Sequence, residues 1–150
     1  MNKIEEIISV FKDLDNELRL ELLLDYAEKL PSIPEEYRNQ EQIEAHRVHE
    51  CQTPVSIWIT VLNDEVCIYA DIPRESPTVR GFVALLIKAF NGASPEEVEI
   101  APADILHRTG LADTLGMIRM HGLSAVYKRI KDETHRADIL NSANREMTNP

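Results

Sequence analysis

The chain has 150 residues, the size of one domain, and its hydrophobic content of 43% excludes a disordered chain. Its 26 acidic residues outnumber its 16 basic residues, and the net charge of −10 argues against binding to nucleic acid or to an anionic membrane. Two cysteines are too few for a disulfide framework, no apolar run approaches the roughly 20 residues that span a bilayer, and the N-terminus lacks the apolar core of an export signal. We therefore expect a protein of the reducing cytoplasm.

The first 46 residues predict two helices and a surface connection. Ile4, Ile7, Ile8 and Phe11 recur at helical spacing, and Asp15 or Asn16 is placed to cap a second helix that continues to about residue 30. Two prolines and many polar residues follow between positions 31 and 46, which is typical of a surface connection.

The middle of the chain predicts an antiparallel hairpin. Residues 54–61 alternate between β-branched and polar side chains, residues 63–65 form a turn signal, and residues 66–70 return as a second strand. Residues 47–50 are expected to add a short third strand before Cys51.

The second half of the chain predicts further helices. One begins after Ser76 with Pro77 at its first position, another begins at a capping box from Ser94 to Glu97, and the last core helix carries Leu123 and Ile130. Residues 137–150 are polar and are expected to form a frayed tail. Together these elements predict a single α+β domain over residues 1–136, in which helices cover one face of a small antiparallel sheet of about three strands.

The two cysteines have different sequence contexts. Cys67 lies inside a predicted strand, where cysteine acts as a small hydrophobic residue, whereas Cys51 precedes a strand at the end of the sheet. Three chemistries compete for Cys51: a zinc site with His46 and His49, a cysteine hydrolase, and a sulfur or redox carrier. The zinc site lacks a fourth ligand and the hydrolase lacks a nucleophile-elbow pattern, so the carrier fits best.

Arg119 lies among apolar residues and two glycines, in the segment Gly116 to Leu123. One interpretation is an arginine at a helix start whose head group reaches solvent while its stem lies along apolar surface. The other is a cation held near an anion on Cys51.

Four segments of the chain resemble the SufE/CsdE family of sulfur-acceptor proteins. "ECQTPVSIWI" resembles the family's Cys-Gln-Ser/Thr loop and strand, and "VRGFVALLIKAFNGASPEEV" resembles its Arg/Lys-Gly helix and Ser/Thr-Pro turn. "IRMHGLSAVYKRIK" is similar to its Arg-x-x-Gly segment, and "LLLDYAEKLPSIPEEYR" is similar to the Leu-Pro end of its second helix. The segments occur in family order between about Phe11 and Lys131.

The resemblance implies a SufE/IscU-like fold and a persulfide carrier that stimulates a SufS/CsdA-type cysteine desulfurase and passes sulfur to an iron–sulfur scaffold complex. Pyridoxal phosphate (PLP) would stay on the desulfurase, so the chain would bind no cofactor and no metal and would have no independent turnover. By position, Cys51 would accept the sulfur, with Arg119, Gln52 and Thr53 in support. Val48, His49 and Glu50 would form the loop that meets the partner.

Three further expectations concern this loop and the state of the protein. Val48, Val55 and Trp58 are expected to shelter the sulfur between encounters. Glu50 stands where many relatives carry glycine, so the loop departs from the family pattern there. We expect a monomer or weak dimer, and the alternative function is an interaction domain whose cysteine is incidental or redox-sensing.

Overall fold

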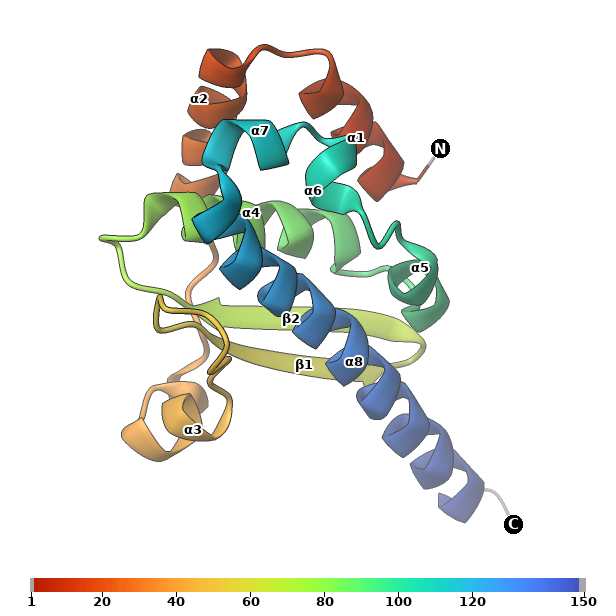
Figure 1. Cartoon of the computed structure of the whole chain (residues 1–150). Helices are drawn as coiled ribbons and strands as arrows, with labels where there is room; N and C mark the ends of the chain where they lie inside the picture. Colours follow the sequence, from red (N-terminus) through yellow and green to blue (C-terminus); the bar gives the residue numbers. More distant parts are fainter. Residues whose placement is uncertain (1, 149–150) are drawn as a thin grey trace.

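The computed structural model describes residues 2–148. Helices precede and follow one β-hairpin in the sequence, as predicted (Figure 1). The elements are α1 (Lys3–Lys12), α2 (Asn16–Glu28), the 3₁₀ helix η1 (Glu35–Tyr37), α3 (Gln40–Ala45), β1 (Ser56–Leu62), β2 (Glu65–Asp71), α4 (Pro77–Phe90), α5 (Pro95–Ile100), α6 (Ile105–Arg108), α7 (Leu111–Leu115) and α8 (Met117–Thr148). Between residues 2 and 148, no helix is both long and apolar enough to cross a bilayer.

The sheet has two strands rather than about three. β1 and β2 pair antiparallel from Ser56–Asp71 to Leu62–Glu65, and Asn63 and Asp64 form the two-residue turn with φ of 53° and 62°, which suits a type I′ hairpin. The expected third strand is reduced to one isolated bridge between Arg47 and Ser56. The chain leaves that bridge at once to form the loop that carries Cys51, so no ladder develops.

One face of the hairpin is covered by α4 and α8, which confirms the predicted helix-covered sheet. Figure 1 shows α8 running diagonally across the hairpin, while α4 lies alongside it. The side chains on this face alternate along both strands and are buried: Ile57, Val61, Val66, Ile68 and Ala70.

Helix α4 is the centre of the core. Eleven of its fourteen residues are buried, because α2, α1 and β2 all pack against it. The closest approach is at Gly81, where a Cβ atom would lie 2.2 Å from the carbonyl oxygen of Leu23 in α2. A side chain at position 81 is therefore excluded by the α2–α4 packing.

The opposite face of the hairpin is partly covered by η1 and α3. The ring of Trp58 stacks on Tyr37 with centroids 4.9 Å apart, and its indole N–H donates to the side-chain oxygen of Gln42 at 3.1 Å. The large indole ring of Trp58, with its N–H hydrogen-bonded, explains why the polar connection that contains η1 and α3 packs against this face of the sheet.

The expected frayed tail is largely helical. α8 runs through Thr148, so residues 137–148 continue the helix that begins at Met117. No proline or glycine lies between Gly122 and Pro150, and nothing in this stretch therefore stops the helix. Its side chains are mostly exposed, with Ile139 and Leu140 more than half accessible.

Candidate functional site: an inward-facing thiol on a closed loop

The loop that carries Cys51 is closed at its base. The backbone N–H of Val48 donates to the carbonyl of Val55 at 2.8 Å, and both valine side chains are fully buried. Within the loop, the N–H of Cys51 donates back to the carbonyl of Val48 at 3.3 Å. The two valines thus anchor the base of the loop in the core, and most of the residues between them lie at the surface.

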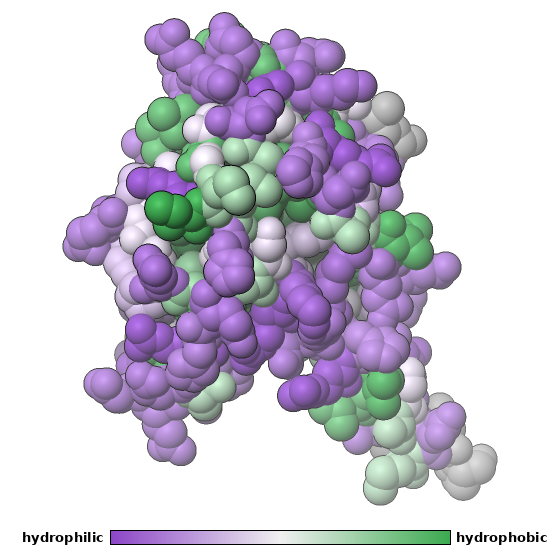
Figure 2. Space-filling model, in the orientation of Figure 1, coloured by the Kyte–Doolittle hydropathy of each residue, from purple (hydrophilic) through white to green (hydrophobic). Residues whose placement is uncertain are grey.

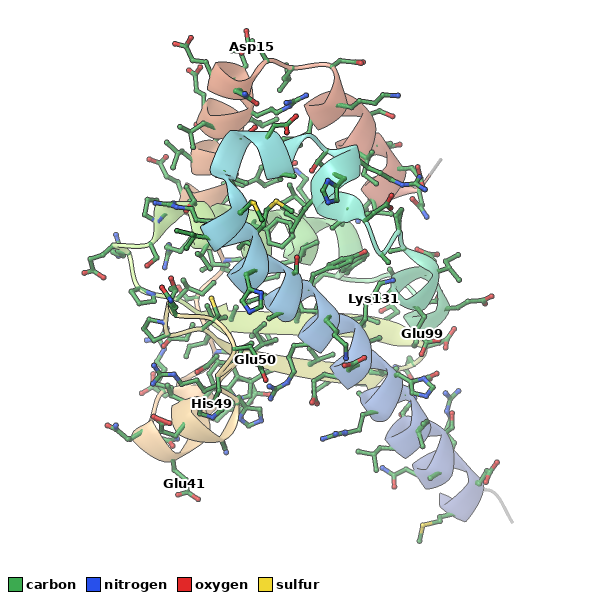
Figure 3. The ribbon with its side chains drawn as sticks, in the orientation of Figure 1. Asp15, Glu41, His49, Glu50, Glu99 and Lys131 are labelled. Atoms are coloured by element: carbon green, nitrogen blue, oxygen red, sulfur yellow. The ribbon has the colours of Figure 1, made fainter. Side chains whose placement is uncertain are left out.

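Cys51 is the one side chain of the loop tip that points inward. Its relative exposure is 8%, and Thr53 is half-buried, whereas four neighbours are exposed: His49, Glu50, Gln52 and Pro54. Figure 3 labels His49 and Glu50 on the side of the loop nearer α3. The loop therefore presents polar residues to solvent and shields its thiol.

The thiol faces a pocket of about 650 Å³ built from four parts of the chain. The loop supplies Glu50, Cys51, Gln52 and Thr53, and the other walls are the N-terminus of α4 with the residues before it, the α7–α8 junction and two leucines of α2, Leu20 and Leu24. Exposed apolar side chains lie at the same junction, where Met117 and Ile118 are more than 80% accessible (Figure 2).

Gly122 in α8 makes room for the sulfur. A Cβ atom on Gly122 would lie 3.2 Å from Cys51 Sγ and 3.8 Å from Cys51 Cα. The helix therefore passes the loop within direct contact distance, and a larger residue would displace one or the other.

The pocket carries a cation and an open helix end. Arg119 Nη1 donates to the hydroxyl of Thr78 in the first turn of α4, and both residues line the Cys51 pocket. Ser76 precedes α4 without a side-chain capping bond, and the first turn of α4 has no acidic residue. A guanidinium and the start of a helix both favour an anion such as a thiolate, whereas Glu50 and Glu75, which line the same pocket, oppose it. The structure thus places Arg119 and Cys51 at the same pocket.

The charge of Glu50 acts on a residue of α8, Lys128. Its carboxylate contributes to raising the pKa of Lys128, after the larger effect of the hydrogen bond from Lys128 to Asp132. The φ of Glu50 is not positive, since Asn63 and Asp64 are the non-glycine residues with positive φ within residues 2–148. The loop therefore does not need glycine at position 50.

The three residues expected to shelter the sulfur do not all lie on its side of the sheet: Val48 and Val55 share a buried cluster with Cys51, and Trp58 does not. Val48 is fully buried at the loop base in the closed loop, and its contact with a partner stays a prediction. Trp58 packs against Tyr37 on the opposite face of the sheet and does not line the Cys51 pocket. Only the loop-base valines lie on the core side as expected.

The three candidate ligands of a zinc site, His46, His49 and Cys51, do not group as metal ligands among the described residues. His46 Nδ1 lies 2.9 Å from the carbonyl of Gln42, and His49 is exposed. Among residues 2–148, no three His, Cys, Asp or Glu side chains group as metal ligands. Cys51 and Cys67 are both free thiols, and Cys67 is half-buried on the sheet face opposite the pocket, opposite Thr60.

Two members of the site were not predicted from the sequence. They are Thr78, which accepts a hydrogen bond from Arg119, and Gly122, which lies against the thiol. The signals were present: a glycine inside a helix three residues after the arginine, and a Ser-Pro helix start without a following acidic residue. The sequence does not show that α4, α8 and the Cys51 loop lie next to one another in space.

The fold and site define a small α+β protein with one sheltered thiol on an exposed loop. Residues 5–134 match the SufE model, described as an Fe-S metabolism associated domain. The chain therefore belongs to the SufE family.

Individual relatives agree with this assignment. An uncharacterized SufE-like protein of Mycobacterium tuberculosis is 29% identical over 134 residues, covering 89% of this chain and 92% of its own. An uncharacterized SufE-like protein of Rhizobium meliloti is 30% identical over 137 residues, covering 89% and 95%. The solution structure of a hypothetical protein from Thermus thermophilus has a TM-score of 0.78 at 34% identity and covers 91% of this chain and 98% of its own.

Proposed function

We propose that the protein is a persulfide carrier that takes sulfur onto Cys51 from a PLP-dependent cysteine desulfurase of the SufS/CsdA type. It stimulates that enzyme and passes the sulfur to an iron–sulfur scaffold complex in the cytoplasm. It binds no PLP and no metal itself. The observation that carries the proposal is the single inward-facing thiol of an otherwise exposed loop, in a chain with a SufE domain.

The transfer is a thiol–disulfide type of exchange. The Cys51 thiolate attacks the outer sulfur of the persulfide on the desulfurase cysteine. A new sulfur–sulfur bond forms on Cys51, the bond on the desulfurase breaks, and its electron pair leaves on the desulfurase thiolate, which then takes up a proton. No external oxidant or reductant is needed, because the sulfane sulfur moves between two equivalent bonds.

The geometry supports both halves of a carrier's task. Burial of Cys51 against Gly122 protects a bound sulfur from other thiols, while Arg119 and the start of α4 favour the anion. Opening needs only the loop tip to move, because Val48 and Val55 hold its base. We expect the loop to turn outward when the desulfurase binds.

The test is desulfurase turnover. Alanine formation by the purified desulfurase, measured with and without the protein in the presence of excess cysteine, is expected to rise when the protein is added. Cys51→Ser is expected to lose at least about tenfold of that stimulation, or ~1.4 kcal/mol of barrier. Equal stimulation by Cys51→Ser would instead favour an interaction domain with an incidental cysteine.

A further inference from the structure

A second, larger hollow continues from the Cys51 pocket. It measures about 1100 Å³ and lies between the end of α2, the connection that follows it, the end of β2 and the start of α4. Leu24 and Pro77 line both hollows. The two hollows therefore adjoin at these two residues, and together they are here called the donor groove, with the thiol in one hollow and the end of β2 at the other.

The far end of the donor groove is rich in arginine. Arg38, Arg74 and Arg80 line it against two carboxylates, Glu28 and Asp71, in a chain whose net charge is −10. The far end therefore has one more basic than acidic side chain, whereas the thiol end is lined by Glu50 and Glu75 as well as Arg119. An anionic group that enters the far end of the groove meets a local cationic surface within an acidic protein.

Two of these arginines have no acidic partner. Arg74 is exposed and makes no hydrogen bond or ion pair within residues 2–148. Arg80 is half-buried and donates from Nη1 to the backbone carbonyl of Ile72 at 2.6 Å, which holds its guanidinium in place without neutralising it. Arg38, in contrast, has Glu35 at 3.8 Å in an exposed pair. Arg74 and Arg80 therefore retain donors for an external carboxylate.

The residues that line the groove favour a polypeptide over a small anion as its ligand. Apolar side chains line it together with the arginines, among them Leu24, Leu30 and Ile33. A phosphate or sulfate ion would leave these walls uncovered, whereas an extended segment with both apolar and acidic residues covers them. The groove also ends at the thiol, where a sulfur donor must arrive.

We propose that the donor groove receives an extended acidic segment of the cysteine desulfurase, the one next to its persulfide cysteine. The segment runs over Leu24 and Pro77 and places an Asp or Glu side chain against Arg74 and Arg80. This inference rests on the proposed function and names the partner surface that fits this chain.

The test is charge reversal at Arg74, which has no internal contact to lose. Arg74→Glu is expected to weaken binding of the purified desulfurase by about tenfold at low salt, and the difference shrinks as ionic strength rises. Arg74→Lys is expected to bind nearly as well as the unchanged protein. Lys3→Glu, which makes the same change in charge at the start of α1, is the matched control and is expected to leave binding unchanged.

If Arg74→Glu and Lys3→Glu bind the desulfurase equally well, the proposal that the donor groove receives a desulfurase segment is wrong. The failure of the proposed function is distinguished by loading Cys51 with a small inorganic polysulfide, which needs no groove. If Cys51 accepts sulfur from polysulfide but Arg74→Glu binds the desulfurase normally, only the groove is wrong. If the unchanged protein binds no desulfurase at all, both proposals fail.

A photocrosslinking residue in place of Ser32, which is exposed on the groove wall, identifies the occupant. Crosslinked peptides are expected to come from the desulfurase segment beside its cysteine and to contain Asp or Glu. Crosslinks to a distant or basic segment of the desulfurase would contradict the proposal.

Discussion

Two helical glycines, Gly81 and Gly122, each pack closely against another part of the chain. The partner of Gly81 is the backbone of a helix, and the partner of Gly122 is a side chain of a loop. Gly81 of α4 faces the backbone of α2, where a Cβ atom would come within 2.2 Å of the Leu23 oxygen. Gly122 of α8 faces the Cys51 side chain of a loop, where a Cβ atom would come within 3.2 Å of the sulfur. The first contact joins two core helices, and the second joins a helix to a loop whose tip is exposed.

The difference separates the fixed part of the molecule from the part that acts. At Gly81 neither helix can move away, because α4 is buried on nearly all sides. At Gly122 the loop can move, because its tip makes one internal backbone bond, from Cys51 to Val48. Local opening is expected where few contacts hold a segment, and that segment here carries the thiol.

The largest expected effect is at Gly81. Gly81→Ala forces a methyl group into the Leu23 carbonyl and is expected to lower the free energy of unfolding by about 3 kcal/mol. Urea denaturation followed by circular dichroism measures it. If Gly81→Ala proves as stable as the unchanged protein, the α2–α4 packing is not as tight as described.

Gly122→Ala is expected to act on the thiol rather than on the fold. The loop is expected to give way, so Cys51 becomes more exposed and alkylation by iodoacetamide speeds up by about tenfold, or ~1.4 kcal/mol. Stability is expected to change by less than about 1 kcal/mol, because alanine also favours the helix. Slower alkylation, or a loss of stability like that of Gly81→Ala, would make the two contacts equivalent.

Thr78→Val tests the contribution of one hydrogen bond, the one that Thr78 accepts from Arg119. Valine keeps the shape but removes the acceptor for Arg119, which is expected to lower stimulation of the desulfurase by about fivefold, or ~1 kcal/mol. Thr78→Ser keeps the hydroxyl and is expected to restore most of the stimulation. Equal losses in both variants would indicate a packing effect and not a role in placing Arg119.

Glu50→Gly carries the smallest expected effect. Since Glu50 does not use positive φ, glycine only adds freedom to the unfolded chain and is expected to lower the free energy of unfolding by about 0.5 kcal/mol. Gln52→Gly, at the other side of Cys51, is the matched control for loop flexibility. A clear gain in stability from Glu50→Gly would show that glutamate strains the loop.

The sequence predicted the elements better than their contacts. Helical spacing from Ile4 to Phe11 and the capping box at Ser94 are local patterns, and both helices form with the expected caps or buried faces. The burial of α4 on nearly all sides depends on α1, α2 and β2 packing against it, which a local pattern does not contain. The third strand was not formed, because tertiary pairing and not local propensity decides whether residues 47–50 join a ladder.

The candidate site divides in the same way. Cys51 stands out from its place before a strand, and the family resemblance adds Arg119. The burial of the thiol, the hydrogen bond from Arg119 to Thr78 and the closeness of Gly122 depend on how distant segments pack, so no local pattern contains them. Trp58 shows the opposite error: it is near Cys51 in sequence but lies on the other face of the sheet.

The central claim is that Cys51 carries sulfur as a persulfide. Intact-mass and peptide mass spectrometry after incubation with a cysteine desulfurase and cysteine tests it most directly. The account predicts an added mass of one sulfur atom on the peptide that contains Cys51, none on Cys67, and none in Cys51→Ser. An unchanged mass at Cys51 with an active desulfurase, or sulfur found on Cys67 alone, would contradict it.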